Sequence, residues 1–155
     1  MQVQLATSAD IPRWLELAAE VEFLFGPMVD QPNFQAALRK NIDRDSAYCV
    51  REQDGSPGTA LMGGLLFSSK PPRYEIGWLS VAEMWRQKGV ATVLLEHVFT
   101  LINPRAELFV KTFGADNPDG LPARKFYEKL GFQPFEESPP GPEGGSREIL
   151  RRTCV

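Results

Sequence analysis

LSVAEMWRQKGVA, the stretch from Leu79 to Ala91, joins a predicted strand to a predicted helix. Leu79-Ser80-Val81 is typical of a strand end, and from Gly89 onward the apolar residues recur at helical spacing. The first backbone amides of such a helix, together with its dipole, attract an anion. Arg86 and Lys88 add positive charge, so the stretch predicts a connection that can hold a phosphate. A tight connection with solvated cations explains the same residues.

Strands and helices alternate on both sides of this stretch. Apolar patterns predict strands over residues 2–6, 47–52, 59–68, 74–81, 106–112, 132–136 and 147–153. Helical spacing predicts helices over residues 9–22, after Gln31-Pro32, from Gly89 to Asn103, and from Asp119 to Leu130. The order β-α-α-β-β-β-α-β-α-β-β predicts an α/β fold, a mixed sheet with helices on both faces, in a single domain over residues 1–155.

Three short segments carry predictions of their own. Residues 23–27, Phe-Leu-Phe-Gly-Pro, are expected to break the first helix. Gly63-Gly64 inside a strand indicates a bulge or a close backbone approach. Lys70-Pro71-Pro72-Arg73 is expected to turn the chain between two strands.

The composition excludes several classes of protein. The 155 residues are 43% hydrophobic and 24% charged, as in a globular domain, and the net charge of −3 gives no electrostatic reason to expect nucleic acid. Two separated cysteines, Cys49 and Cys154, and one histidine, His97, make no metal-binding pattern, so we expect no metal. No apolar run reaches the ~18–20 residues of a membrane span, which predicts a cytoplasmic protein without a membrane partner.

A second motif lies toward the end of the chain. It comprises Asn117 and the segment ARKFYEKLGF, Ala123 to Phe132. Tyr127 has large apolar neighbours on a predicted helix, so it fits a tyrosine packed on the sheet. A phenol with a pKa near ~10 is also a good proton donor to a basic leaving group.

The two motifs together resemble the Gcn5-related N-acetyltransferase (GNAT) superfamily. Arg86 to Ala91 matches its acyl-CoA loop, Q/R-x-x-G-x-G/A, and the second motif matches its Asn followed by A-x-x-F/L-Y-x-x-x-G-F. This resemblance implies a GNAT-like fold and an N-acyltransferase that transfers acetyl from acetyl-CoA to a small-molecule or peptide amine. A non-catalytic acyl-CoA-binding or sensor module on the same fold is the alternative, and a homodimer is left open.

The resemblance also implies residue roles. The strand before the loop would splay from its neighbour, and the backbone of Leu79 and Val81 would bond the pantetheine amides. Asn117 would bond the pantetheine arm, and Tyr127 would protonate the departing CoA thiolate. The pyrophosphate would lie on the loop beside Arg86, on the amides of Gln87, Lys88, Gly89, Val90, Ala91 and Thr92.

The chain departs from the family pattern at two places. Pro118 to Pro122 lengthens the spacing between Asn117 and Ala123, so Asp116 or Arg124 can contact the cosubstrate instead. Thr112 stands where some members carry a carboxylate base, and a threonine cannot serve as one.

Weaker candidates lie elsewhere. Glu75 could deprotonate the amine directly or through water, although a salt-bridged strand residue is the simpler interpretation. Glu22 and Asp30 are candidate contacts for a cationic substrate or solvated loop carboxylates. The apolar segment from Val21 to Val29 predicts either an aromatic wall of a substrate cleft or a lid over the core.

Overall fold

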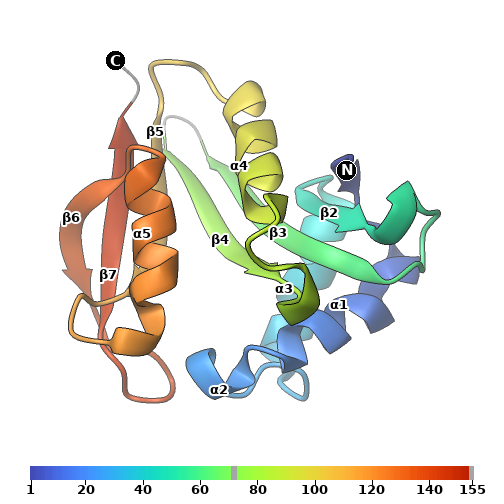
Figure 1. Cartoon of the computed structure of the whole chain (residues 1–155), viewed down its shortest axis with the longest axis horizontal. Helices are drawn as coiled ribbons and strands as arrows, with labels where there is room; N and C mark the ends of the chain where they lie inside the picture. Colours follow the sequence, from blue (N-terminus) through green and yellow to red (C-terminus); the bar gives the residue numbers. More distant parts are fainter. Residues whose placement is uncertain (71–72, 154–155) are drawn as a thin grey trace.

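The computed structural model describes residues 1–70 and 73–153 and contains one seven-stranded mixed sheet (Figure 1). The strands, in the sheet order β1-β2-β3-β4-β5-β7-β6, are β1 Gln4–Leu5, β2 Ala47–Arg51, β3 Leu61–Lys70, β4 Arg73–Val81, β5 Glu107–Phe113, β7 Arg147–Thr153 and β6 Gln133–Ser138. Among the described strands, only β4 and β5 pair in parallel, and the other neighbours are antiparallel. The mixed sheet predicted from the element order is confirmed.

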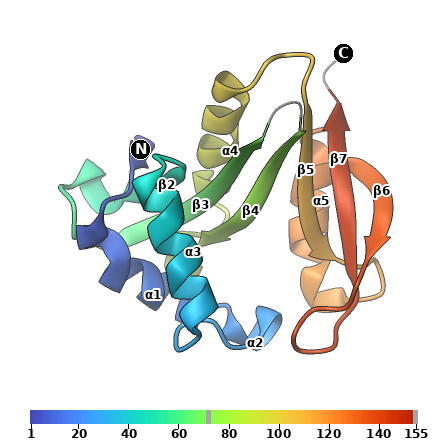
Figure 2. The same ribbon diagram turned by 180° about the vertical axis from the view of Figure 1, so that it is seen from behind.

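Helices cover both faces of the sheet (Figures 1 and 2). The helices are α1 Ile11–Ala19, α2 Glu22–Phe25, α3 Pro32–Asp43, α4 Val90–Leu101 and α5 Leu121–Lys129. Apolar residues of α4 and α5 pack with strands β2 to β5 and β7 on one face. Those of α1 and α3 pack with β2 and β3 on the other, where Trp14 contacts Trp78 with ring centroids 5.5 Å apart. Helices α1, α3, α4 and α5 therefore bury their apolar sides against the sheet.

The expected break after the first helix contains a helix of its own. Helix α1 ends at Ala19, and the four residues of α2 form one further turn before Gly26, whose φ of +90° ends it. The predicted turn at residues 70–73 includes Pro71 and Pro72, and these two residues and Cys154 lie outside the described residues.

The Gly63-Gly64 pair marks a close approach from both faces of the sheet. A Cβ on Gly64 would lie 2.7 Å from Cη2 of Trp14, and a Cβ on Gly63 would lie 2.8 Å from Cγ1 of Val90. The register of β3 also shifts beside Gly63, where Met62 has no direct partner between Val50 and Arg51. The prediction for this pair is confirmed, because only glycine lets α1 and α4 come so near to β3.

The parallel strands β4 and β5 pair over only part of their lengths. Their register runs from Arg73–Glu107 to Ile76–Val110, and beyond that point the strands diverge (Figure 2). Gly77 is the extra residue of a bulge against β3, which bends β4 away from β5 at this point. The predicted splay is therefore present, and its open end lies beside the first turn of α4 and the start of α5.

A buried ion pair fixes the N-terminal segment. The guanidinium of Arg51 donates to both carboxylate oxygens of Asp10 at 2.7 and 3.0 Å, and both side chains are almost fully buried. Burial opposes ionisation of Asp10, but hydrogen bonds from Arg51 and from the amides of Gly58 and Thr7 outweigh it and hold its pKa below the usual value.

None of the helices within residues 1–70 and 73–153 has the length and hydropathy of a membrane span.

Candidate active site

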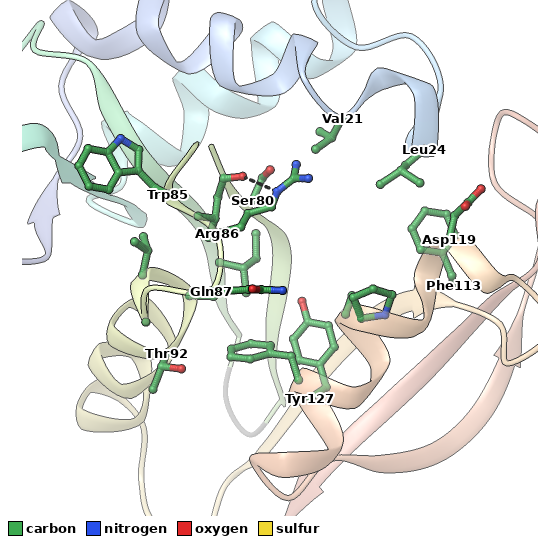
Figure 3. A pocket seen from close by; sticks show the side chains of 18 of the residues that line it. Val21, Leu24, Ser80, Trp85, Arg86, Gln87, Thr92, Phe113, Asp119 and Tyr127 are labelled. Atoms are coloured by element: carbon green, nitrogen blue, oxygen red, sulfur yellow. Dashed lines mark hydrogen bonds between the residues drawn. The ribbon is translucent and has the colours of Figure 1, made fainter. Parts of the chain in front are cut away.

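A cavity of about 520 Å³ opens where β4 and β5 diverge (Figure 3). Its walls come from the end of β4, the first turn of α4, the start of α5 and the α1–α2 segment. The lining residues are Val21, Leu24, Phe25, Leu79, Ser80, Val81, Trp85, Arg86, Gln87, Gly89, Val90, Ala91, Thr92, Phe113, Asp119, Pro122, Ala123, Phe126 and Tyr127. Residues far apart in the sequence, including both predicted motifs, thus meet at one site.

The end of β4 presents backbone groups that β3 does not pair to this cavity. The Ala82 amide donates to the Met62 carbonyl at 2.8 Å, so the alternation of an antiparallel ladder pairs Ser80 with β3. The same alternation turns the amides and carbonyls of Leu79 and Val81 toward the open side. Nε of Arg86 donates to the Val81 carbonyl at 3.2 Å, which holds the loop against the strand end (Figure 3).

The first turn of α4 points its amides toward the same space. Helix α4 starts at Val90, and the amides of Val90, Ala91 and Thr92 have no intrahelical acceptor in an α-helix. The preceding Gly89 lies in the left-handed region at φ +87°, and no side chain caps the helix. A Cβ on Gly89 would have nothing within 4 Å, so backbone conformation is the direct reason for glycine.

Gln87 also has a positive φ, of 62°, which is rare for a residue with a side chain. Gln87 and Gly89 thus both have positive φ, and left-handed residues of this kind occur in the backbone nests that bind anions. The loop therefore stores backbone strain where the anion site was predicted.

Tyr127 lies at the floor of the cavity. Its ring is packed between Phe126 and Phe132, with centroids 5.4 Å away in each pair, and only 6% of the residue is exposed. Figure 3 shows its hydroxyl directed into the cavity. Burial raises the pKa of Tyr127 well above that of a free phenol, so the hydroxyl keeps its proton at neutral pH.

Apolar and aromatic residues form the wall opposite the α4 loop. Leu24 and Phe25 of α2 face Phe113 at the end of β5, with the Phe25 and Phe113 centroids 4.9 Å apart. Glu22, a weak sequence candidate, accepts hydrogen bonds from the amides of Met28 and Val29 at 2.6 and 3.0 Å, and these bonds lower its pKa. Glu22 thus closes the α2 loop, and the α2 segment contributes a wall.

Four predicted site residues do not line the cavity. Asn117 accepts from the Asp119 amide at 3.0 Å, and Arg124 is buried in an ion pair with Glu148 at 2.6 Å. Lys88 lies with Nζ 5.8 Å from the centre of the Trp85 ring. Glu75 is a half-buried residue of β4 paired in register with Ser68 and Phe109.

Several other sequence candidates also lie away from the cavity. Asp116 accepts a short hydrogen bond from the Ser146 hydroxyl, and Thr112 is buried on β5. His97 packs on Tyr48 with ring centroids 4.9 Å apart. The thiol of Cys49 is buried, which raises its pKa to about 11.

For some of the lining residues, the sequence predicted no role in the site. Trp85 reaches the cavity with its indole N–H bonded to Glu52 at 3.0 Å, and Ser80 is buried at the strand end. Asp119 and Pro122 belong to the segment that lengthens the spacing between Asn117 and Ala123 relative to the family pattern. This longer spacing was the one sequence feature that could have pointed to them.

The chain is similar to known proteins in its sequence pattern and in its fold. Residues 10–132 match the Acetyltransferase (GNAT) family. Ard1 from Thermoplasma volcanium superposes with a TM-score of 0.75 at 16% identity, covering 99% of this chain and 97% of that one. Ribosomal-protein-alanine N-acetyltransferase from Brucella melitensis gives 0.73 at 14% identity and 99% of both chains. A chain of the NatC complex, solved with Gag peptide and CoA, gives 0.74 at 16% identity and 100% of both.

These identities establish a shared fold and nothing finer. Among curated protein sequences no significant match was found.

Proposed function

Since the chain belongs to the Acetyltransferase (GNAT) family, we propose that it transfers an acetyl group from acetyl-CoA to a primary amine by direct attack. The observation that carries the proposal is the meeting of three features in one cavity: the free edge of β4, the uncapped first turn of α4 and the buried hydroxyl of Tyr127.

The chemistry of the cavity fits an acyl-CoA. The pyrophosphate would be held by the amides of the α4 turn, with Arg86 adding positive charge beside them. The amides of the pantetheine arm would bond the exposed backbone of Leu79 and Val81, as a further strand bonds a sheet edge. Acetyl-CoA, when bound, supplies the activated acetyl thioester. Asn117, Arg124 and Lys88 have other partners or lie outside the lining, and their contact with the cosubstrate stays a prediction.

Tyr127 would act as the general acid. Its raised pKa keeps a proton on the hydroxyl, and no hydrogen bond to the described residues engages that hydroxyl. The proton is therefore available to the sulfur that leaves when the amine nitrogen bonds the acetyl carbon and the C–S bond breaks. Holding both reactants in one cavity would supply most of the acceleration.

The amine must lose a proton during this reaction. Glu75 could accept it only through water, because it does not line the cavity, and its role as a base stays a prediction. We also propose a cytoplasmic location, and the buried free thiol of Cys49 fits a reducing compartment.

Release of CoA thiol from acetyl-CoA, measured with a panel of alkyl amines, peptides with free amino termini and aminoglycosides, tests the proposal. We expect amine-dependent thiol release together with the acetylated amine in the mass spectrum. Calorimetric binding of acetyl-CoA without thiol release for any amine would instead support the non-catalytic acyl-CoA-binding module.

A further inference from the structure

The segment between β5 and α5 places one carboxylate in the cavity. Residues Pro118–Gly120 form a 3-10 turn, fixed by the hydrogen bond from the Asp119 amide to Oδ1 of Asn117. Gly120 is buried against Phe113, and a Cβ there would overlap the Phe113 side chain. The turn is therefore pressed onto the end of β5, and the position of Asp119 at the cavity wall follows from that contact.

Asp119 differs from the other acidic residues of this region. Glu148 pairs with Arg124, Glu143 pairs with Arg147, and Asp116 accepts from Ser146. Within residues 1–70 and 73–153, no cation or hydrogen-bond donor engages the Asp119 carboxylate. Among the lining residues of that same part of the chain, Asp119 is the sole carboxylate. The cavity thus contains an exposed negative charge without a partner.

The surroundings of this charge are apolar. Figure 3 shows Asp119 on the same side of the cavity as Leu24 and Phe113, across from Arg86. Phe25 packs against Phe113 at the same wall, with the two rings tilted by 32°. A cation with an apolar body would therefore meet complementary groups on both of its parts, a carboxylate for the charge and aromatic rings for the body.

We propose that the amine acceptor is a primary amine with an aryl or alkyl body, bound as its ammonium ion to Asp119 and packed on Phe113 and Leu24. This inference rests on the proposed acetyl transfer and names the class of acceptor for it. Asp119 acts in binding rather than in the chemical step, because a carboxylate that stabilises the ammonium form also opposes its deprotonation. Loss of the carboxylate should raise KM for the amine and leave kcat unchanged or higher.

Two probes of matched shape test the charge and the apolar body separately. 2-Phenylethylamine is cationic at pH 7, and 2-phenylethanol replaces its ammonium group with a neutral hydroxyl. Both are titrated by calorimetry or ligand-observed NMR into the wild-type protein saturated with CoA, into Asp119→Asn and into Glu128→Gln. Glu128 is an exposed residue of α5 outside the cavity, so this control removes one negative charge from the helix that follows the Asp119 turn.

We expect Asp119→Asn to weaken phenylethylamine binding about fivefold or more, with phenylethanol unchanged and Glu128→Gln equal to wild type. Equal affinities of wild type and Asp119→Asn for phenylethylamine would overturn the inference. So would an equal loss for phenylethanol, or no binding of phenylethylamine to wild type. Acetyl-CoA is titrated in parallel: wild type that binds no acetyl-CoA refutes the proposed function itself, and a loss of acetyl-CoA affinity in Asp119→Asn assigns the residue to the cosubstrate instead.

Discussion

Replacing Tyr127 by phenylalanine separates the chemistry of its hydroxyl from the packing of its ring. The ring fills a site between Phe126 and Phe132 that phenylalanine occupies equally well. Because the hydroxyl has no hydrogen-bond partner among the described residues, its removal should change the free energy of unfolding by less than about 1 kcal/mol. General acid catalysis contributes ~10²–10⁴-fold, so kcat should fall by that factor, or about 3–5 kcal/mol in activation free energy.

The assay is CoA thiol release at saturating acetyl-CoA and amine, with a thermal melt of each variant. Tyr74→Phe is the matched control, because Tyr74 is a half-buried residue of β4 outside the cavity whose ring stacks on Phe67. The raised pKa of Tyr127 adds a second expectation: the ratio of wild-type to Tyr127→Phe rates should stay constant from about pH 6 to 9, since the hydroxyl remains protonated throughout. A wild-type rate in Tyr127→Phe, with acetyl-CoA affinity intact, would refute the role of Tyr127 as the acid.

Two further predictions concern the buried ion pair and the proton acceptor. Asp10→Asn leaves the charge of Arg51 buried without its partner and should lower the free energy of unfolding at pH 7 by about 3–5 kcal/mol in urea titrations. Because the pKa of Asp10 is lowered in the folded protein, its stabilisation is present above about pH 4 and is lost as pH falls through the native pKa. The difference in free energy of unfolding between wild type and Asp10→Asn should therefore become smaller in acid, and a difference that stays constant with pH would contradict this. Glu75→Gln should reduce kcat/KM at pH 7, with a deficit that shrinks toward the pKa of the amine; equal rates across pH 6 to 9 would show that solvent accepts the proton.

Local patterns were sufficient to predict the strand-to-helix connection and the helix that carries Tyr127, whereas a place for Tyr127 at the site was implied by the family resemblance. The change from strand to helical spacing at Gly89 is a property of neighbouring residues, and the left-handed φ there requires glycine. The Gly63-Gly64 pair was predicted for the same reason, since missing side chains in an apolar strand indicate close neighbours.

The features of the site that the sequence could not predict depend on contacts between residues far apart in the chain. Arg124 was a candidate for the cosubstrate, but β7 brings Glu148 to it, and this pairing across 24 positions leaves no trace in local spacing. Asp119 reaches the cavity because Gly120 packs on Phe113, a contact between a loop and a strand end. The division of β4 from β5 likewise depends on the bulge at Gly77, whose register is set by β3.

Calorimetric titration with acetyl-CoA tests the central claim most directly, in wild type, Gly89→Asp and Gly144→Asp. Gly144 is a matched control, because it has φ +88° and open space around its Cβ but lies in the exposed loop between β6 and β7. A carboxylate at ~4 Å from a phosphate costs on the order of 4 kcal/mol at an effective dielectric of ~20, before screening. The account predicts that wild type and Gly144→Asp bind acetyl-CoA alike and that folded Gly89→Asp loses at least about a hundredfold in affinity; unchanged affinity in Gly89→Asp would contradict it.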